Sequence, residues 1–132
     1  MNRVIRLLAF TTASLLLTTL SVTPSHSHSA IVSSIPKASA TLTAAPTSIT
    51  LNFNEDILEL KGKQISTVSL ATFAGKVIAL KKPQVTANRL TARIASPALK
   101  SGKYQISYRV VSADGHVITG GYTFSIALTK GK

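Results

Sequence analysis

The chain has 132 residues, with 15 Lys and Arg against only 4 Asp and Glu, which gives a formal net charge of +11. It contains no cysteine, and this excludes disulfide bonds and thiolate metal sites. Nucleic-acid binding is not expected, because basic and aromatic residues do not interleave as a strand-binding groove requires. The lysines fall mostly at expected turns and strand ends, where they keep sheet edges from pairing. Attraction to an acidic membrane or partner surface is the alternative.

Residues 1–27 have the composition of a secretory signal peptide. Arg3 and Arg6 precede an apolar run over 7–22, and a small-residue cleavage motif follows at 25–27. The apolar run has about 16 residues, fewer than the roughly 20 that a helix needs to cross a bilayer. We therefore expect cleavage after residue 27 and export to the periplasm. The mature chain then keeps 13 Lys and Arg against 4 acidic residues, a net charge of +9.

Residues 28–132 are expected to form one all-β domain. Apolar and polar residues alternate with a period of two, the pattern of strands that bury one face. Turn-forming residues separate these runs, notably at 114–115 and at 120–121. The short strands predict an antiparallel Greek-key β-sandwich or barrel of about seven strands. Strands are expected over 30–35, 49–53, 65–72, 76–80, 90–94, 104–110 and 122–126, with one helical turn over 56–61.

Candidate metal ligands lie at the expected new N-terminus and at one turn. His28 would offer its α-amine and its imidazole in one chelate ring. Asp114 and His116 flank Gly115 and offer a carboxylate and a second imidazole. Three nitrogens and one oxygen form a tetragonal set that favours Cu(II). Glu55 would lie behind the ligands, accepting a hydrogen bond from the amine and orienting it.

Each of these residues has a simpler explanation when it is considered alone. Asp-Gly is a common hairpin turn, His116 can be an ordinary strand-end histidine, and Glu55 can be a solvated acid after a strand. Their joint arrangement with an N-terminal histidine is what favours a metal site. Cleavage after Ser25 is an alternative, and it would place His26-Ser27-His28 at the terminus. A histidine at the third position can bind Cu(II) together with the amine and the intervening amides, without Asp114 or His116. In either case acid should weaken binding, because the amine and imidazoles must lose their protons.

Several runs of the chain match one known family. His28 is followed by a short strand, a Ser pair and Pro36, a strand ending in Glu55 comes next, and an aromatic-Arg strand leads into Ser-Ala-Asp-Gly-His over 112–116. Over residues 28–126 the chain resembles the CopC/PcoC-type periplasmic copper resistance proteins. The only methionine is Met1, so the chain is similar to the Cu(II)-only branch, without thioethers to select Cu(I).

The resemblance implies a small β-sandwich, cupredoxin-like or immunoglobulin-like, that binds Cu(II) through the N-terminal His, Asp114 and His116. It also implies a carboxylate near the copper at Glu55. Members of the family are thought to keep copper for, or hand it to, an inner-membrane partner of the CopD type. We expect a monomeric, non-enzymatic protein for copper storage, transfer or resistance.

Two other functions stay open on the sequence. An N-terminal histidine brace also occurs in copper oxygenases that attack polysaccharides, although the absence of Trp and the expected position of Asp114 on the copper argue against one. A metal-free interaction module is the second alternative, because sandwiches host many unrelated functions. A hydrolase is less favoured, since two histidines and no cysteine leave little for a nucleophile and its base.

Overall fold

Alternation of apolar and polar residues places one face of each long strand in the core. In β3 (Ser48–Phe53), every second side chain is fully buried, namely Ile49, Leu51 and Phe53. β7 (Arg89–Arg93) follows the same rule, with Leu90 and Ala92 buried. Side chains at i and i+2 share one face of a strand, so the apolar positions of neighbouring strands combine into a continuous surface.

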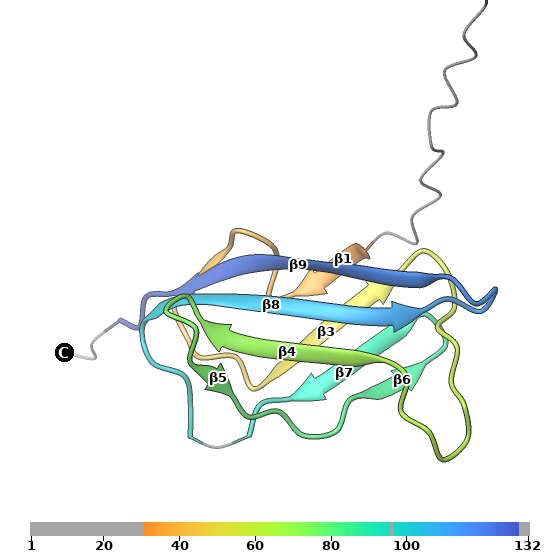
Figure 1. Ribbon diagram of the computed structural model, residues 1–132. Coiled ribbons are helices and arrows are strands. Elements are labelled where there is room, and N and C mark those ends of the chain that lie inside the picture. The colour runs from red at the N-terminus through yellow and green to blue at the C-terminus, as the bar shows by residue number, and fades with distance from the viewer. Residues whose placement is uncertain (1–30, 96, 130–132) are drawn as a thin grey trace, which may run out of the picture.

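The computed structural model describes residues 31–95 and 97–129, and these form a two-layered β-sandwich (Figure 1). One sheet has the strand order β1-β3-β7-β6, and the other has the order β2-β9-β8-β4-β5. The remaining strands are β1 (Ile31–Ile35), β2 (Thr41–Leu42), β4 (Thr67–Thr72), β5 (Val77–Ile78), β6 (Gln84–Thr86), β8 (Gly102–Val111) and β9 (Val117–Ile126).

The core lies between the two sheets and draws on both. Phe53 packs edge-on against Tyr108 with ring centroids 5.6 Å apart, and Tyr104 stacks on Phe124 at 5.5 Å. The first pair joins β3 of one sheet to β8 of the other, and the second lies across the β8–β9 ladder. The other buried members of this cluster are Ile49, Leu51, Ile57, Leu70, Leu90, Leu99, Ile106, Val110 and Ile126.

The all-β prediction is confirmed, and the details differ in three places. Residues 31–95 and 97–129 form nine strands rather than about seven. The two that were not predicted, β2 and β6, are too short to show alternation. β2 pairs with β9 in parallel, so that sheet is mixed rather than wholly antiparallel. The helical turn expected over 56–61 is wrong: the described residues contain no helix, and Ile57 instead bridges to Ser112.

The prediction of a turn at Gly120-Gly121 is also wrong, because the last strand is longer than expected and runs through both glycines. Both glycines lie inside β9, where Gly120 faces Tyr108 and Gly121 faces Ser107 across the ladder. A Cβ atom on Gly121 would stand 2.5 Å from the backbone oxygen of Ile106. Glycine is needed here for close approach of the neighbouring strand rather than for a turn.

The paired strands β8 and β9 form the longest hairpin and carry the candidate site at its tip. Ten residue pairs, from Gly102–Ile126 to Val111–Val117, form the ladder. The connection is the short segment 112–116, so the predicted Asp-Gly turn at 114–115 is confirmed. No helix in the described ranges is long and apolar enough to span a membrane.

Candidate metal centre

A hydrogen-bonded turn between β8 and β9 positions Asp114 and His116. The amide of Ser112 donates to the carbonyl of His116 at 2.9 Å, and the amide of Gly115 donates to the carbonyl of Ser112 at 2.8 Å. Gly115 has a φ of 91°, which a residue with a side chain adopts only with strain. The Asp-Gly-His order therefore folds back on itself and brings the two flanking side chains together.

The carboxylate of Asp114 and the imidazole of His116 are in direct contact. Asp114 Oδ2 lies 2.7 Å from His116 Nδ1, and both side chains are open to solvent, at 58% and 79% exposure. Two ligand atoms that hold a first-row metal at about 2.0 Å and at right angles lie about 2.8 Å apart. The observed separation is that of a hydrogen bond, and it is also close to this spacing, so the two atoms can occupy adjacent corners of a tetragonal metal site with little movement.

Ser112 orients the Asp114 carboxylate from the buried side of the turn. Its side chain is almost fully buried, at 1% exposure, and its hydroxyl donates a hydrogen bond to Asp114 Oδ1. The same hydroxyl lies 3.3 Å from the carbonyl of His116. Sequence reasoning missed this role, although a serine two residues before an aspartate at a turn is a known local hydrogen-bonding pattern.

These hydrogen bonds lower the pKa of Asp114 from 3.8 to about 2. The bond from Ser112 has the largest effect, and the contact with His116 adds to it. Both interactions favour the charged form of the carboxyl group. Asp114 therefore stays a carboxylate, ready to bind a cation, at any pH near neutrality.

The segment that follows β3 packs beside this turn. The amide of Ala113 donates to the carbonyl of Asp56 at 2.9 Å, and the amide of Leu58 donates to the carbonyl of Val111 at 2.8 Å. Glu55 lies one residue before Asp56 and is exposed. The predicted supporting acid is thus on the neighbouring segment of chain, at the same end of the sandwich as the Asp114–His116 pair.

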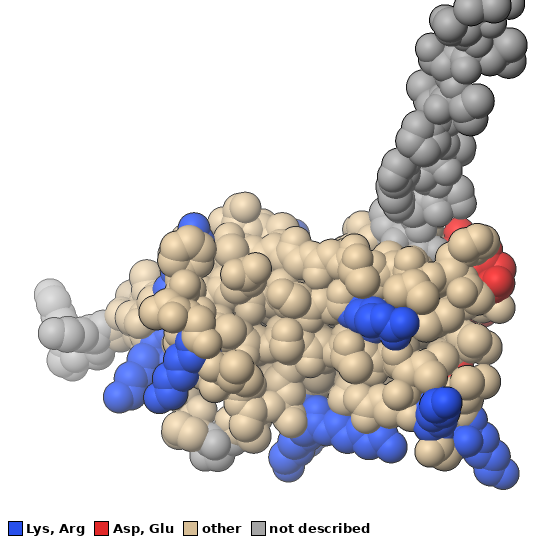
Figure 2. All heavy atoms as spheres, viewed as in Figure 1, with Lys and Arg blue, Asp and Glu red and all other residues tan. Residues whose placement is uncertain are grey.

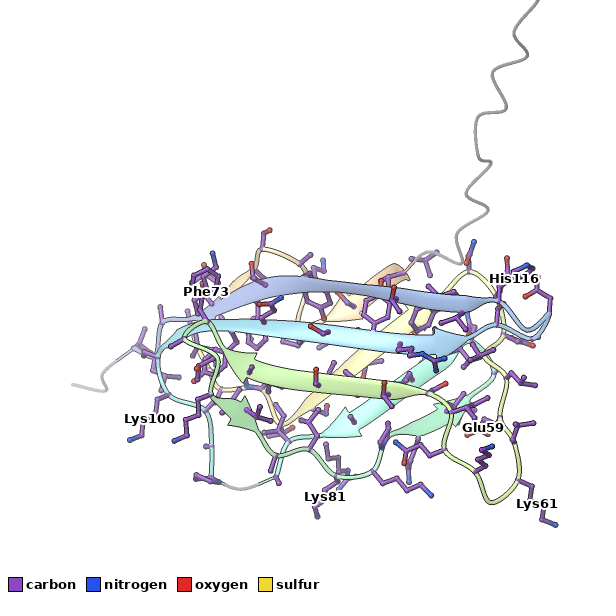
Figure 3. The ribbon with its side chains drawn as sticks, in the orientation of Figure 1. Glu59, Lys61, Phe73, Lys81, Lys100 and His116 are labelled. Atoms are coloured by element: carbon purple, nitrogen blue, oxygen red, sulfur yellow. The ribbon has the colours of Figure 1, made fainter. Side chains whose placement is uncertain are left out.

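The start of β1 reaches this end as well. Ile31 pairs with Phe53 at the end of β3, two residues before Glu55. Figure 3 shows His116 at the end of the sandwich where the β8–β9 hairpin closes, and Figure 1 shows β1 beginning at that same end. His28, the predicted amine and imidazole donor, lies outside the described residues.

The described part of the chain does not complete a metal site by itself. Within it, no three His, Cys, Asp or Glu side chains come together in a way that could hold an ion. Asp114 and His116 supply two ligands on an open surface. A tetragonal ion held there needs further ligands from elsewhere, and β1 begins at this end of the molecule with Ile31.

The fold and the turn together define a class of protein, a small two-sheet β-sandwich with an Asp-His pair on one hairpin. The CopC domain family matches residues 31–127. The chain belongs to this family. It is similar to Protein YobA of Escherichia coli strain K12, at 37% identity over 84% of this chain and 89% of that one. It is also similar to copper resistance protein C of Escherichia coli, at 30% identity over 75% of this chain and 81% of the other.

Solved structures agree with the family assignment. CopC from Methylosinus trichosporium OB3b has a TM-score of 0.66 and 28% identity, covering 80% of this chain and 99% of that one. PcoC from Escherichia coli, described as a methionine-rich copper resistance protein, has a TM-score of 0.63 and 32% identity, covering 76% and 99%. The present chain differs in composition from that neighbour, because its single methionine is Met1.

Proposed function

We propose that the mature protein binds one Cu(II) ion through four atoms. The α-amine and imidazole of His28 supply two nitrogens, His116 supplies the third, and Asp114 supplies an oxygen. Glu55 accepts a hydrogen bond from the amine and orients it. The observation that carries the proposal is the 2.7 Å contact between Asp114 and His116, at the end of the sandwich where β1 begins.

Ligand chemistry supports Cu(II) over other ions. The proposed set has nitrogen and carboxylate donors, which suit a tetragonal Cu(II) centre. The chain has no cysteine, and its single methionine is at position 1, so the soft ligands that select Cu(I) are absent from the mature chain. An open surface site with an ionised carboxylate also suits an ion that is taken up and passed on.

The proposed role is storage, transfer or resistance in the periplasm. The signal peptide over 1–27 directs export, and its removal creates the terminal amine on which the chelate depends. The copper is cargo rather than a catalytic cofactor, and a monomer is sufficient to hold it. A CopD-type inner-membrane protein is the proposed recipient. Relatives named copper resistance protein C support the general role.

Titration of the exported and processed protein tests the proposal. Intact-protein mass spectrometry first establishes that the sample begins at His28, since cleavage after Ser25 would raise the mass by one Ser and one His. Cu(II) is then titrated in competition with a chelator of known affinity. We expect one equivalent to bind tightly, and we expect a single glycine added before His28 to weaken binding sharply, because the amine moves out of the chelate ring.

Two variants serve as the matched arms of this experiment. His116→Ala should weaken Cu(II) binding, whereas Lys81→Ala, which changes an exposed residue away from the turn, should leave it unchanged. Equal affinity with and without the added glycine would overturn the proposal. Tight binding accompanied by rapid oxygen consumption under reductant would instead indicate a copper oxygenase.

A further inference from the structure

The acidic residues of the chain are confined to one end of the sandwich. All four belong to the segment after β3 or to the β8–β9 turn, and they are Glu55, Asp56, Glu59 and Asp114. These two segments are joined by the hydrogen bond from Ala113 to Asp56. In Figure 2 the red atoms gather at this end, where blue atoms also occur, and only blue atoms mark the charged residues on the rest of the visible face. Lys61 and Lys63 lie in the same segment as Glu59, so this end carries both signs of charge, whereas the opposite end carries no acid.

The opposite end is basic and carries exposed apolar side chains. β8 has 10 residues, so its two ends lie about 30 Å apart at the usual rise of a strand. Its first residues lie beside the β4–β5 turn, because the amide of Phe73 donates to the carbonyl of Lys103 at 2.9 Å. We call Phe73, Lys76, Val77, Lys100 and Lys103 the basic end. Figure 3 shows Phe73 and Lys100 at the end of the molecule away from His116.

The aromatic ring at this end is held out into solvent by a well-formed turn. Phe73 is 64% exposed and Val77 is 74% exposed. Thr72 and Lys76 close the turn, with the amide of Thr72 donating to the carbonyl of Lys76 at 2.8 Å. Lys103 Nζ lies 4.5 Å from the centroid of the Phe73 ring. A cation beside an exposed aromatic ring is the pairing that suits the boundary between headgroups and acyl chains.

We propose that the basic end docks the protein on a membrane surface of anionic phospholipids. The lysines meet the headgroup phosphates, and Phe73 with Val77 enters the interfacial layer. Charge complementarity supports this occupant: the basic end contains three lysines and no acid, and the four acids lie at the far end, where they avoid the negative surface. In this orientation the Asp114–His116 turn faces away from the lipid. The inference does not depend on copper binding.

Vesicle co-sedimentation of the exported and processed protein tests this docking. The probes are vesicles of phosphatidylglycerol and phosphatidylcholine in equal amounts, with pure phosphatidylcholine as the neutral control. We expect binding to the anionic vesicles only, and release as the salt approaches about 1 M, where the Debye length is about 3 Å. Phe73→Ala should weaken binding several-fold, because it removes the apolar anchor.

A pair of charge-matched variants separates a defined surface from attraction by net charge alone. Lys76→Gln, Lys100→Gln and Lys103→Gln together should weaken binding about 100-fold, because each lysine near an anionic surface contributes about fivefold. A control that carries Lys61→Gln, Lys63→Gln and Lys82→Gln loses the same charge from exposed positions elsewhere and should lose much less.

Three results would overturn the docking proposal. They are equal losses in the two triple variants, no loss in Phe73→Ala, and no binding of the unaltered protein to anionic vesicles. Copper affinity is measured on the same samples. It should be unchanged in the basic-end variants if the metal site is as proposed, and an unchanged melting temperature shows independently of copper that these variants are folded.

Discussion

Replacing Ser112 with alanine isolates the orientation of the Asp114 carboxylate. The serine hydroxyl donates to Asp114 Oδ1, and this bond is the largest cause of the lowered pKa of that carboxyl group. The backbone bonds that close the turn do not involve the hydroxyl, so Ser112→Ala should keep the turn. The carboxylate loses its support while both proposed ligands, Asp114 and His116, stay in place.

The expected effect of Ser112→Ala follows from two consequences of that lost bond. Loss of a group that orients a metal ligand typically weakens metal binding by 10- to 100-fold. Because His116 still contacts the carboxylate, we expect the lower limit, about tenfold in the Cu(II) dissociation constant. The pKa of Asp114 should rise from about 2 toward its ordinary value of 3.8. Chelator competition measures the first quantity, and carbon-detected nuclear magnetic resonance of the apoprotein measures the second.

Ser66 provides a matched control for the loss of a buried serine hydroxyl. Its side chain is 4% exposed, and its Oγ has no hydrogen-bond partner within the described residues. Ser66→Ala should therefore leave both copper affinity and the pKa of Asp114 unchanged, with stability equal or slightly higher. If Ser112→Ala also left the pKa near 2 and the affinity unchanged, the reasoning about carboxylate orientation would be refuted.

Three further substitutions test the site and the fold. The lowered pKa of Asp114 means that its charge stabilises the fold above about pH 4 and that this contribution is lost as the pH falls toward about 2. The Asp114→Asn variant has no such charge to lose. Chemical denaturation should therefore show a smaller loss of stability over that acid range in Asp114→Asn than in the unaltered protein. Gly121→Ala should destabilise the protein by about 1–3 kcal/mol, because its Cβ would meet the Ile106 oxygen at 2.5 Å, and an unchanged melting temperature would disprove this close approach. Tyr122→Phe should cost about 1 kcal/mol, seen as a lower melting temperature, because the hydroxyl donates to the Pro36 carbonyl at 2.8 Å; no decrease would show that the bond adds nothing.

Local patterns predicted the parts of the fold that depend on alternation and on turn chemistry. The strand containing Leu51 and the strand containing Ile106 both show a period of two, and both form with the expected faces buried. The Asp-Gly turn was predictable because those residues favour a tight hairpin. Its consequence, the contact between Asp114 and His116, follows directly from the two-residue spacing around Gly115.

The parts that sequence could not predict depend on contacts between distant segments. Gly120-Gly121 has the composition of a turn, yet the glycines are needed because the backbone of β8 passes close to β9. β2 is a strand only because it pairs with β9. Ser112 can orient the Asp114 carboxylate because it is buried where it forms a β-bridge with Ile57, a residue far away in the chain. The prediction for His28 stays a prediction, since it lies outside the described residues.

Electron paramagnetic resonance of the mature protein with one equivalent of Cu(II) tests the central claim most directly, because it reports the nitrogen atoms bound to the ion. We predict a single tetragonal signal with three coupled nitrogens, which falls to two in His116→Ala. The same number of coupled nitrogens in both proteins would contradict the account, because His116 would then lie outside the copper site.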